Sequence, residues 1–195
     1  LYKGNYTSTL ATILQSYKDR GFVTSFTTKN YNMHKLSNFS KIIEHADAIA
    51  ISANTLEELA KAHELKKHIS ESGQRCSVYV QTILELLPWE ETLQWFEEAR
   101  KHHFQGITFL GYKSFGFGVN ETPNAVPDDW FQQFKKRGAN VGIDSVLATK
   151  YKDQLIAGGV EEYKLVGTDG LSTCYVDAVK KTVARNSFCD DVHAF

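Results

Sequence analysis

Polar side chains follow five apolar segments of this sequence, each at the point where a predicted β-strand ends. A strand buried on both faces has no need of polar residues, so five polar ends indicate a rim that contacts water or a ligand. The candidate binding residues are Thr28 and Asn30 of TTKN, Ser52 and Asn54 of SAN, Gln81 of QT, Leu110, Gly111, Tyr112 and Lys113 of LGYK, and Asp144 of DS. Part of this set has a structural alternative, because Asn54 can begin a helix and Asn30 can turn a loop.

Lys113 and Asp144 follow successive predicted strands and suggest covalent chemistry. A lysine in an apolar pocket can have its pKa lowered enough to act as a nucleophile, and a carboxylate beside it can serve as the acid-base partner. The pair therefore predicts, as one alternative, a barrel aldolase or lyase that forms a Schiff base and needs no metal cluster.

The stretch GYKSFGFG (111–118) contains glycines but runs from a strand into aromatic residues instead of opening a helix. It is a poor match to a phosphate-binding loop, and the sequence also lacks G-x-G-x-x-G between strand and helix, H-E-x-x-H and C-x-x-C. Two interpretations stay open. The stretch forms the wall of a ligand pocket, or it is a tight corner in which Phe115 and Phe117 cover the core.

The elements that must position these residues alternate along the chain with a period of about 30 residues, the length of a βα unit. The predicted strands are FVTSFTT, AIAIS, CSVYVQTI, GITFL and NVGIDSVL. Amphipathic helical segments separate them, so the strands must be mostly parallel. Thr55 and Glu58 have the spacing of a capping box, whereas Gly21 and Gly138 are suited to follow the ends of two other helices.

Residues 1–165 are therefore predicted to form an α/β domain, either an open or partial barrel or a doubly wound sheet, whose ligand site lies at the carboxyl ends of its strands. The segment KYKDQLIAGG is predicted as the last helix of this domain. Residues 166–195 are predicted to form a C-terminal β-hairpin extension, because STCYVDAVKKTVARNSFC has the pattern of two strands joined by a turn.

The composition favours neither a nucleic acid nor a membrane as the partner. Lysine and arginine number 22 against 23 acidic residues, for a net charge of -1. No apolar run approaches the ~20 residues of a membrane-spanning helix, and the first residues lack the regions of a signal peptide, so we expect a cytoplasmic protein. The three cysteines, Cys76, Cys174 and Cys189, do not form a disulfide framework, and Cys76 is expected to be a buried apolar side chain.

The order of the strand ends TTKN, SAN, VQTI and FLGYKSFGFG resembles the later part of a radical S-adenosylmethionine (SAM) enzyme. The opening helix, TSTLATILQSYKDRGF, is similar to the helix that follows the Gly-Gly-Glu-type strand of that family, and the resemblance covers most of residues 1–160. It implies that residues 1–165 form an incomplete, partial (β/α)6-type TIM-like barrel that binds SAM and a [4Fe-4S] cluster. The enzyme would cleave SAM reductively and start radical chemistry on an unknown substrate, with flavodoxin or ferredoxin as the reductant.

The same resemblance implies roles for the rim residues. Ser52 and Asn54 would lie near the ribose or the amino-acid part of SAM, with Gln81 facing the same ligand. Gly111 would let the backbone approach adenine, and Leu110 and Tyr112 would supply apolar contact; the remaining residues implied to bind the cofactor are Thr28, Asn30, Lys113 and Asp144.

The family's C-x3-C-x2-C cluster motif does not occur in this sequence, so its ligands are expected upstream of Leu1. No metal ligand and no catalytic residue is assigned within the chain itself. Cys174 and Cys189 lie in a tail similar to one that holds an auxiliary cluster in some family members, but a cluster usually takes four thiolates. The missing motif also leaves a further alternative, a barrel that binds a partner and catalyses nothing.

Overall fold

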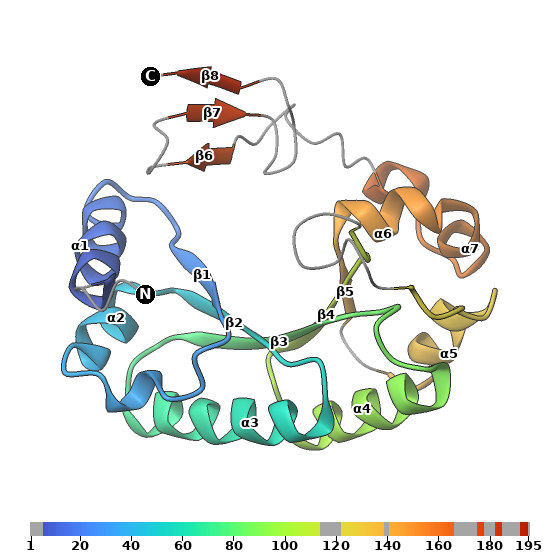
Figure 1. The fold of residues 1–195 in the computed structure, drawn as a ribbon, viewed down its shortest axis with the longest axis horizontal. Helices are drawn as coiled ribbons and strands as arrows, with labels where there is room; N and C mark the ends of the chain where they lie inside the picture. The colour runs from blue at the N-terminus through green and yellow to red at the C-terminus, as the bar shows by residue number, and fades with distance from the viewer. Residues whose placement is uncertain are drawn as a thin grey trace.

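The fold was determined from a computed structural model, which describes residues 6–113, 122–138, 141–165, 175–177, 182–184 and 192–194. Five parallel strands alternate with helices along most of the chain, and three short strands follow (Figure 1). The strands are β1 (Ser25–Thr28), β2 (Ala48–Ser52), β3 (Ser77–Ile83), β4 (Gly106–Leu110), β5 (Val141–Ile143), β6 (Tyr175–Asp177), β7 (Thr182–Ala184) and β8 (Val192–Ala194). The helices are α1 (Tyr6–Lys18), α2 (Phe39–His45), α3 (Leu56–Glu71), α4 (Trp89–Lys101), α5 (Trp130–Lys136), α6 (Ser145–Lys150) and α7 (Lys152–Ala157), with 3-10 turns at Met33–Lys35 and Glu162–Leu165.

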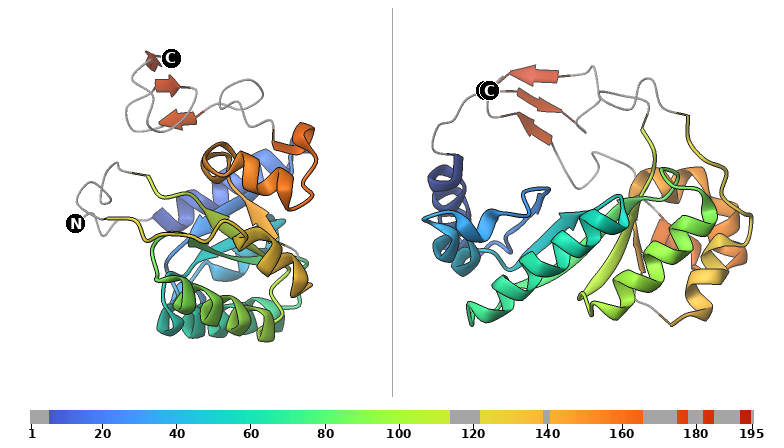
Figure 2. Two further views of the ribbon diagram at one scale, coloured as in Figure 1. Left: turned by 90° about the vertical axis from the view of Figure 1, so that its right-hand side faces the viewer. Right: turned by 60° about the horizontal axis from the view of Figure 1, so that its bottom comes forward.

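The main sheet has the order β1-β2-β3-β4-β5, and every neighbouring pair is parallel. This order confirms the predicted α/β class with parallel strands. Each strand pairs with the next one along the chain, so the order never reverses within the sheet. Helices α3 and α4 lie side by side on one side of the sheet (Figures 1 and 2).

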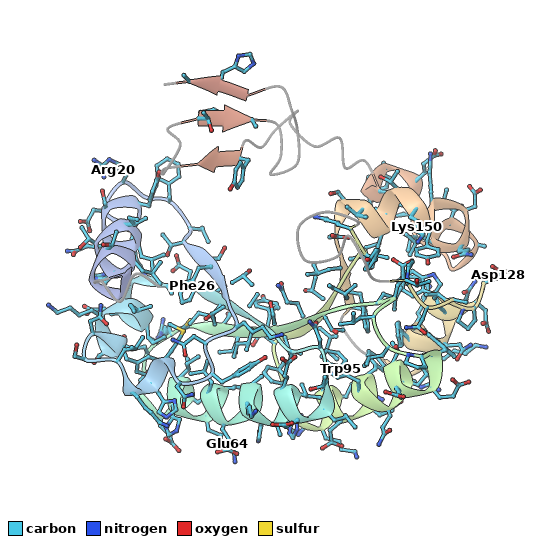
Figure 3. The ribbon with its side chains drawn as sticks, in the orientation of Figure 1. Arg20, Phe26, Glu64, Trp95, Asp128 and Lys150 are labelled. Carbon is cyan, nitrogen blue, oxygen red and sulfur yellow. The ribbon has the colours of Figure 1, made fainter. Side chains whose placement is uncertain are left out.

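The helix-covered face of the sheet is apolar because alternate residues of each strand point to it. Ile49 and Ile51 of β2, Val80 of β3 and Phe109 of β4 are fully buried there. Phe109 stacks on Phe134 of α5 with ring centroids 4.6 Å apart, and Trp95 lies between α4 and the sheet (Figure 3). These contacts join the sheet to the helices in one core.

Helix ends follow their predicted signals. Thr55 precedes α3 and its hydroxyl oxygen accepts a hydrogen bond from the Glu58 N–H at 3.1 Å, while the Glu58 carboxylate accepts from the Asn54 N–H at 2.7 Å. Gly21 and Gly138 follow α1 and α5 with φ values of 81° and 68°, the left-handed conformation that glycine adopts without strain.

Four predicted boundaries were wrong. In CSVYVQTI the strand begins only at Ser77. In FVTSFTT the strand begins only at Ser25, because the preceding residues form the turn after α1. In NVGIDSVL the strand ends at Ile143, since Asp144 caps α6 and turns the last three residues into helix. The segment KYKDQLIAGG is not one helix, because Tyr151 separates α6 from α7.

The C-terminal extension contains the predicted antiparallel pair, β6 with β7, and a third strand, β8, pairs with β7. This small sheet lies on the side of the main sheet opposite α3 and α4 (Figures 1 and 2). Cys174 and Cys189, and the residues Phe115 and Phe117 of the glycine-aromatic stretch, lie outside the described residues.

Candidate functional site

The face of the main sheet that points away from α3 and α4 is lined by small and uncharged polar side chains. Near the carboxyl ends of the strands, Ser52, Gln81, Thr108 and Gly142 stand side by side in the strand register. The Gln81 amide donates to the Ser52 hydroxyl oxygen at 2.9 Å. A Cβ at Gly142 would meet the Thr108 hydroxyl at 3.2 Å, so the row is closely spaced.

A second row of the same face lies one pleat further from the carboxyl ends. It consists of Thr27, Ala50, Tyr79 and Gly106, again in register. Tyr79 is partly buried between two small neighbours, so the face combines hydroxyl groups with one aromatic ring. We call residues Thr27, Ser52, Tyr79, Gln81 and Thr108 the open polar face.

Ser52 and Gln81 were both predicted as site residues, and the structure brings them together. Asn54 lies beyond Ser52, where its side-chain oxygen accepts from the Thr82 hydroxyl at 3.3 Å. Asn54 therefore joins the ends of β2 and β3, in addition to bonding Glu58 through its N–H at the start of α3.

Thr28 and Asn30 make local turn contacts and are not part of the open polar face. Thr28 pairs in register with Ile51, a helix-facing residue, and its hydroxyl accepts from the Asn30 N–H at 3.0 Å. The Asn30 side chain in turn accepts from the Asn32 N–H at 3.1 Å. Hydrogen bonds to the backbone two residues away are typical of turns, so the structure supports the structural interpretation of both residues.

Charged and phenolic groups flank the ends of β1 and β2. Lys29 forms an ion pair with Glu58 at 2.7 Å, and the Tyr31 hydroxyl donates to the Ser52 carbonyl at 2.7 Å. Burial, and the negative charge of Glu58, raise the pKa of Tyr31 to about 12. Partial burial acts to raise the pKa of Glu58, but hydrogen bonds from Lys29 and the Asn54 N–H outweigh it, and the net shift is downward.

Gly111, Lys113 and Asp144 come together at the carboxyl ends of β4 and β5. One Asp144 oxygen accepts from the N–H groups of Gly111 and Leu147, each at 2.9 Å, and the other lies 3.9 Å from the Lys113 ammonium. A Cβ at Gly111 would lie 2.4 Å from Val146 Cγ1, so close packing against α6 requires glycine there. This contact gives Gly111 a structural role whether or not its backbone also meets a ligand.

Leu110 and Tyr112 flank Gly111 and are both partly buried. The Leu110 carbonyl accepts from the Leu84 N–H at 3.0 Å, which extends the pairing of β3 and β4 past the last strand residues. The Tyr112 N–H donates to the carboxylate of Glu85 at 3.0 Å.

Glu85 is a site residue that sequence reasoning missed. It follows β3 by two residues and is 1% exposed. Its carboxylate also accepts from the Tyr151 hydroxyl at 2.9 Å and pairs with the Lys150 ammonium. Burial, with the neighbouring Glu85 carboxylate, raises the pKa of Tyr151. The signal was present in ILELLP, where a single charged residue interrupts an apolar run directly after a strand.

The described residues do not fit an iron-sulfur cluster. Within them, no group of three or more His, Cys, Asp or Glu side chains could hold a metal ion. Cys76 was expected to be buried, but it is only partly buried and precedes β3, at the end of the sheet opposite the rim. Burial, and the charge of Asp47, raise the pKa of its thiol to about 11, which opposes the thiolate form that metal ligation needs.

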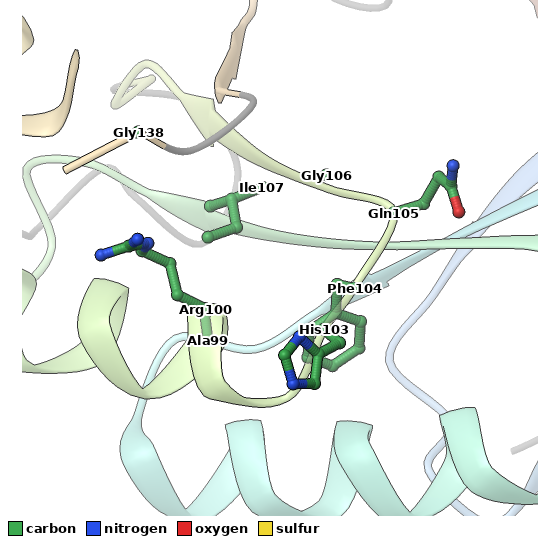
Figure 4. Close-up of a pocket in the computed structure, with 8 residues that line it drawn as sticks. All are labelled: Ala99, Arg100, His103, Phe104, Gln105, Gly106, Ile107 and Gly138. Carbon is green, nitrogen blue, oxygen red and sulfur yellow. The ribbon is translucent and has the colours of Figure 1, made fainter.

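Two cavities lie away from Ser52 and Gln81. One, of about 240 Å³, lies at the amino-terminal end of β4 and is bordered by Arg100, His103 and Gly138. Its polar side chains do not converge, because Arg100 and Gln105 extend in different directions (Figure 4). The other, of about 300 Å³, lies beside β5 and reaches the rim only at Asp144 and Ser145.

Comparisons with known proteins add no relative. No family model matches the chain, no curated protein matches it, and no solved structure matches it. Among the helices of the described residues, none is long and apolar enough to cross a membrane.

Proposed function

We propose that this chain forms the SAM-binding part of a radical SAM-type barrel and binds SAM at the carboxyl ends of β2, β3 and β4. The observation that carries the proposal is the pairing of Ser52 with Gln81 on the face of a sequentially ordered parallel sheet that points away from α3 and α4. Ligands of such sheets bind at the carboxyl ends of the strands.

The architecture supports a partial (β/α)6 barrel as the finer description of the fold. A barrel of βα units requires strands in sequential order, each paired with the next, and β1 to β5 have this order. Barrel strands also alternate between residues that face the helices and residues that face the interior. Here the first set is apolar and the second is the open polar face.

The chemistry of the open polar face fits the polar groups of SAM. Hydroxyl and amide side chains complement ribose hydroxyls and the amino-acid group through hydrogen bonds. Ser52, Gln81 and Thr108 would hold these groups, while Leu110 and Tyr112 would border the adenine. When bound with its cluster, SAM supplies the radical chemistry, and the residues of this chain bind and orient it.

The proposal for the described residues stops at binding of SAM and does not extend to its reductive cleavage, because these residues do not fit a [4Fe-4S] cluster. Under the proposal, the cluster ligands and a reductant such as flavodoxin or ferredoxin come from outside the described part of the chain.

Isothermal titration of the chain with SAM tests the proposal. Replacing Gln81 by leucine removes the amide but keeps a similar volume. SAM affinity should therefore fall about tenfold, which corresponds to the free energy of one or two hydrogen bonds. Glu97→Gln, on the outer helix α4, is the matched control and should bind like the wild type. No saturable binding of SAM by the wild type, or equal affinity in Gln81→Leu, would contradict the proposal.

A second candidate function, a Schiff-base aldolase or lyase, is favoured by one contact, the 3.9 Å approach of the Lys113 ammonium to Asp144. A lysine nucleophile would attack a carbonyl carbon and lose water to form an imine, which borohydride reduces to a stable secondary amine. Borohydride trapping with pyruvate, followed by peptide mass spectrometry, would place the adduct on Lys113. An absence of adduct on Lys113, with Lys113→Met as the control, removes this candidate.

A further inference from the structure

The buried carboxylate of Glu85 contacts two segments that are far from it in the sequence, one at Tyr112 and one at Lys150 and Tyr151. It accepts the N–H of Tyr112 after β4, the hydroxyl of Tyr151 between α6 and α7, and a contact from the Lys150 ammonium at the end of α6. The Glu85 carbonyl also accepts from the Asn124 N–H at 2.9 Å. All these partners donate, which matches a carboxylate, since a carboxylate only accepts.

Burial of a carboxylate costs several kcal/mol unless its partners are well placed, and an apolar side chain of similar volume often gives equal or greater stability. General stabilisation of the core is therefore a weak explanation for Glu85. The position of Glu85 is more informative, because it lies two residues beyond β3, at the carboxyl ends of the strands where the candidate site lies.

Glu85 and Asp144 act on consecutive peptide groups. Asp144 accepts the N–H of Gly111 at 2.9 Å, and Glu85 accepts the N–H of Tyr112 at 3.0 Å. Gly111 is also packed against Val146. With both N–H groups bonded to carboxylates, the orientation of two successive peptide planes is set, and with it the direction of the chain at Lys113.

We propose that Glu85 is a positioning residue, which holds residues 111–113 against α6 and thereby places Tyr112 and Lys113 at the ligand site. It acts through the Tyr112 N–H and does not itself touch the ligand. The effect on SAM affinity rests on the proposed function, whereas the effect on residues 111–113 does not.

The test compares Glu85→Gln with Glu97→Gln, since Glu97 also pairs with cationic side chains, Arg100 and Arg137, but on the outer helix α4. The glutamine keeps the size of the side chain, but its NH2 group replaces one of the two oxygens that accept hydrogen bonds in Glu85. One of the donors around residue 85 then loses its acceptor. Hydrogen exchange at the Tyr112 amide should become about tenfold faster, while exchange at core amides such as Ile51 stays unchanged. SAM affinity should fall about tenfold in Glu85→Gln and stay at the wild-type value in Glu97→Gln.

Faster exchange at Tyr112 with unchanged SAM affinity would overturn the proposal, because Glu85 would then serve the local structure alone. Equal acceleration at Ile51 would overturn it too, since Glu85 would then support the whole core. If Glu85→Gln does not fold, Lys150→Met takes its place, because it removes one partner of Glu85. Hydrogen exchange at Tyr112 should then become faster and SAM affinity should fall, each by a smaller factor. If neither the exchange rate nor the affinity changes, the proposal is overturned.

A wild type that does not bind SAM would end the proposed function but not the test of Glu85. The readout is then the acetylation rate of Lys113 with acetic anhydride, measured by peptide mass spectrometry. The positioning role predicts that this rate changes in Glu85→Gln and not in Glu97→Gln. An unchanged rate overturns the role.

Discussion

The two faces of the main sheet are built from alternate residues of the same strands, yet they differ in almost every property. On β4, Phe109 is 0% exposed and packs among aromatic rings of α4 and α5, whereas its neighbour Thr108 is partly exposed beside Gln81. The first face is complete, because helices cover it. The second carries hydroxyl and amide groups, such as those of Ser52 and Gln81, and it is the face on which we propose that SAM binds.

Burial and polarity along one strand thus distinguish the helix-facing residues, which form the core, from the residues of the open polar face, which are candidates for ligand binding. Helix-facing residues should determine stability, and residues of the open polar face should determine binding. Substitutions on opposite faces of one strand test this division.

The largest effect is expected at Phe109. Phe109→Ala removes a fully buried ring that stacks on Phe134, and should lower the free energy of unfolding by about 3–5 kcal/mol. Thr108→Ala on the opposite face should change it by less than about 0.5 kcal/mol. Urea denaturation followed by circular dichroism measures both, and similar losses in the two variants would contradict the division of the faces.

A smaller loss of stability is expected from substituting Gly111 than from substituting Phe109, and it should distinguish Gly111 from Gly142. Gly111→Ala places a Cβ 2.4 Å from Val146 Cγ1 and 3.0 Å from the Leu147 backbone nitrogen, so overpacking should cost about 1–3 kcal/mol. At Gly142 the nearest atom is the Thr108 hydroxyl, 3.2 Å away, and that partly exposed side chain can rotate. Gly142→Ala should therefore unfold at nearly the wild-type urea concentration, and a loss as large as that of Gly111→Ala would show that both glycines are held equally tightly.

The smallest effect is a pH dependence in the helix layer. The rings of His63 on α3 and His102 after α4 stack with centroids 3.9 Å apart. Burial lowers the pKa of His63, and the positive charges of His102, Lys67 and Lys66 lower it further. Burial also lowers the pKa of His102, although the negative charge of Glu98 acts to raise it. Since the unfolded chain titrates near the ordinary value of about 6.5, it binds more protons than the folded chain just below that pH.

Stability from this pair is therefore fully present above about pH 6.5 and is lost as the pH falls toward the lower folded pKa values. Urea midpoints at pH 7.5 and pH 5.5 should differ more in the wild type than in a His63→Asn, His102→Asn double variant. His193→Asn, at an exposed histidine of β8, is the control and should keep the wild-type difference. An equal pH difference in all three proteins would mean that the stacked pair does not carry the effect.

Much of the fold followed from periodicity. The apolar segments AIAIS and CSVYVQTI predict β2 and β3, the second one residue too long, and the Thr55 and Glu58 spacing marks the start of α3, because these signals are local. The end of β5 was missed, since Asp144 is compatible with a polar strand end and with a helix cap, and only the tertiary structure decides between them.

The candidate site was predictable only in part. Ser52 and Gln81 were expected at the same end of the sheet, because strands joined by crossover helices are parallel. Their direct contact depends on the register of β2 with β3, which only the structure shows. Thr28 and Asn30 were chosen for their place at a strand end, where short turns use the same side chains. Glu85 was not predicted, because its partners Tyr112 and Tyr151 are 27 and 66 residues away in the sequence and come together only in the folded chain.

Amide chemical-shift mapping shows where SAM binds. In ¹H–¹⁵N spectra of the full chain, we expect SAM to shift the backbone amides of Ser52, Gln81 and Thr108 and the side-chain amide of Gln81. Shifts confined to Arg100, His103 and Gly138, around the cavity at the opposite end of β4, or no shifts at saturating SAM, would contradict the proposal.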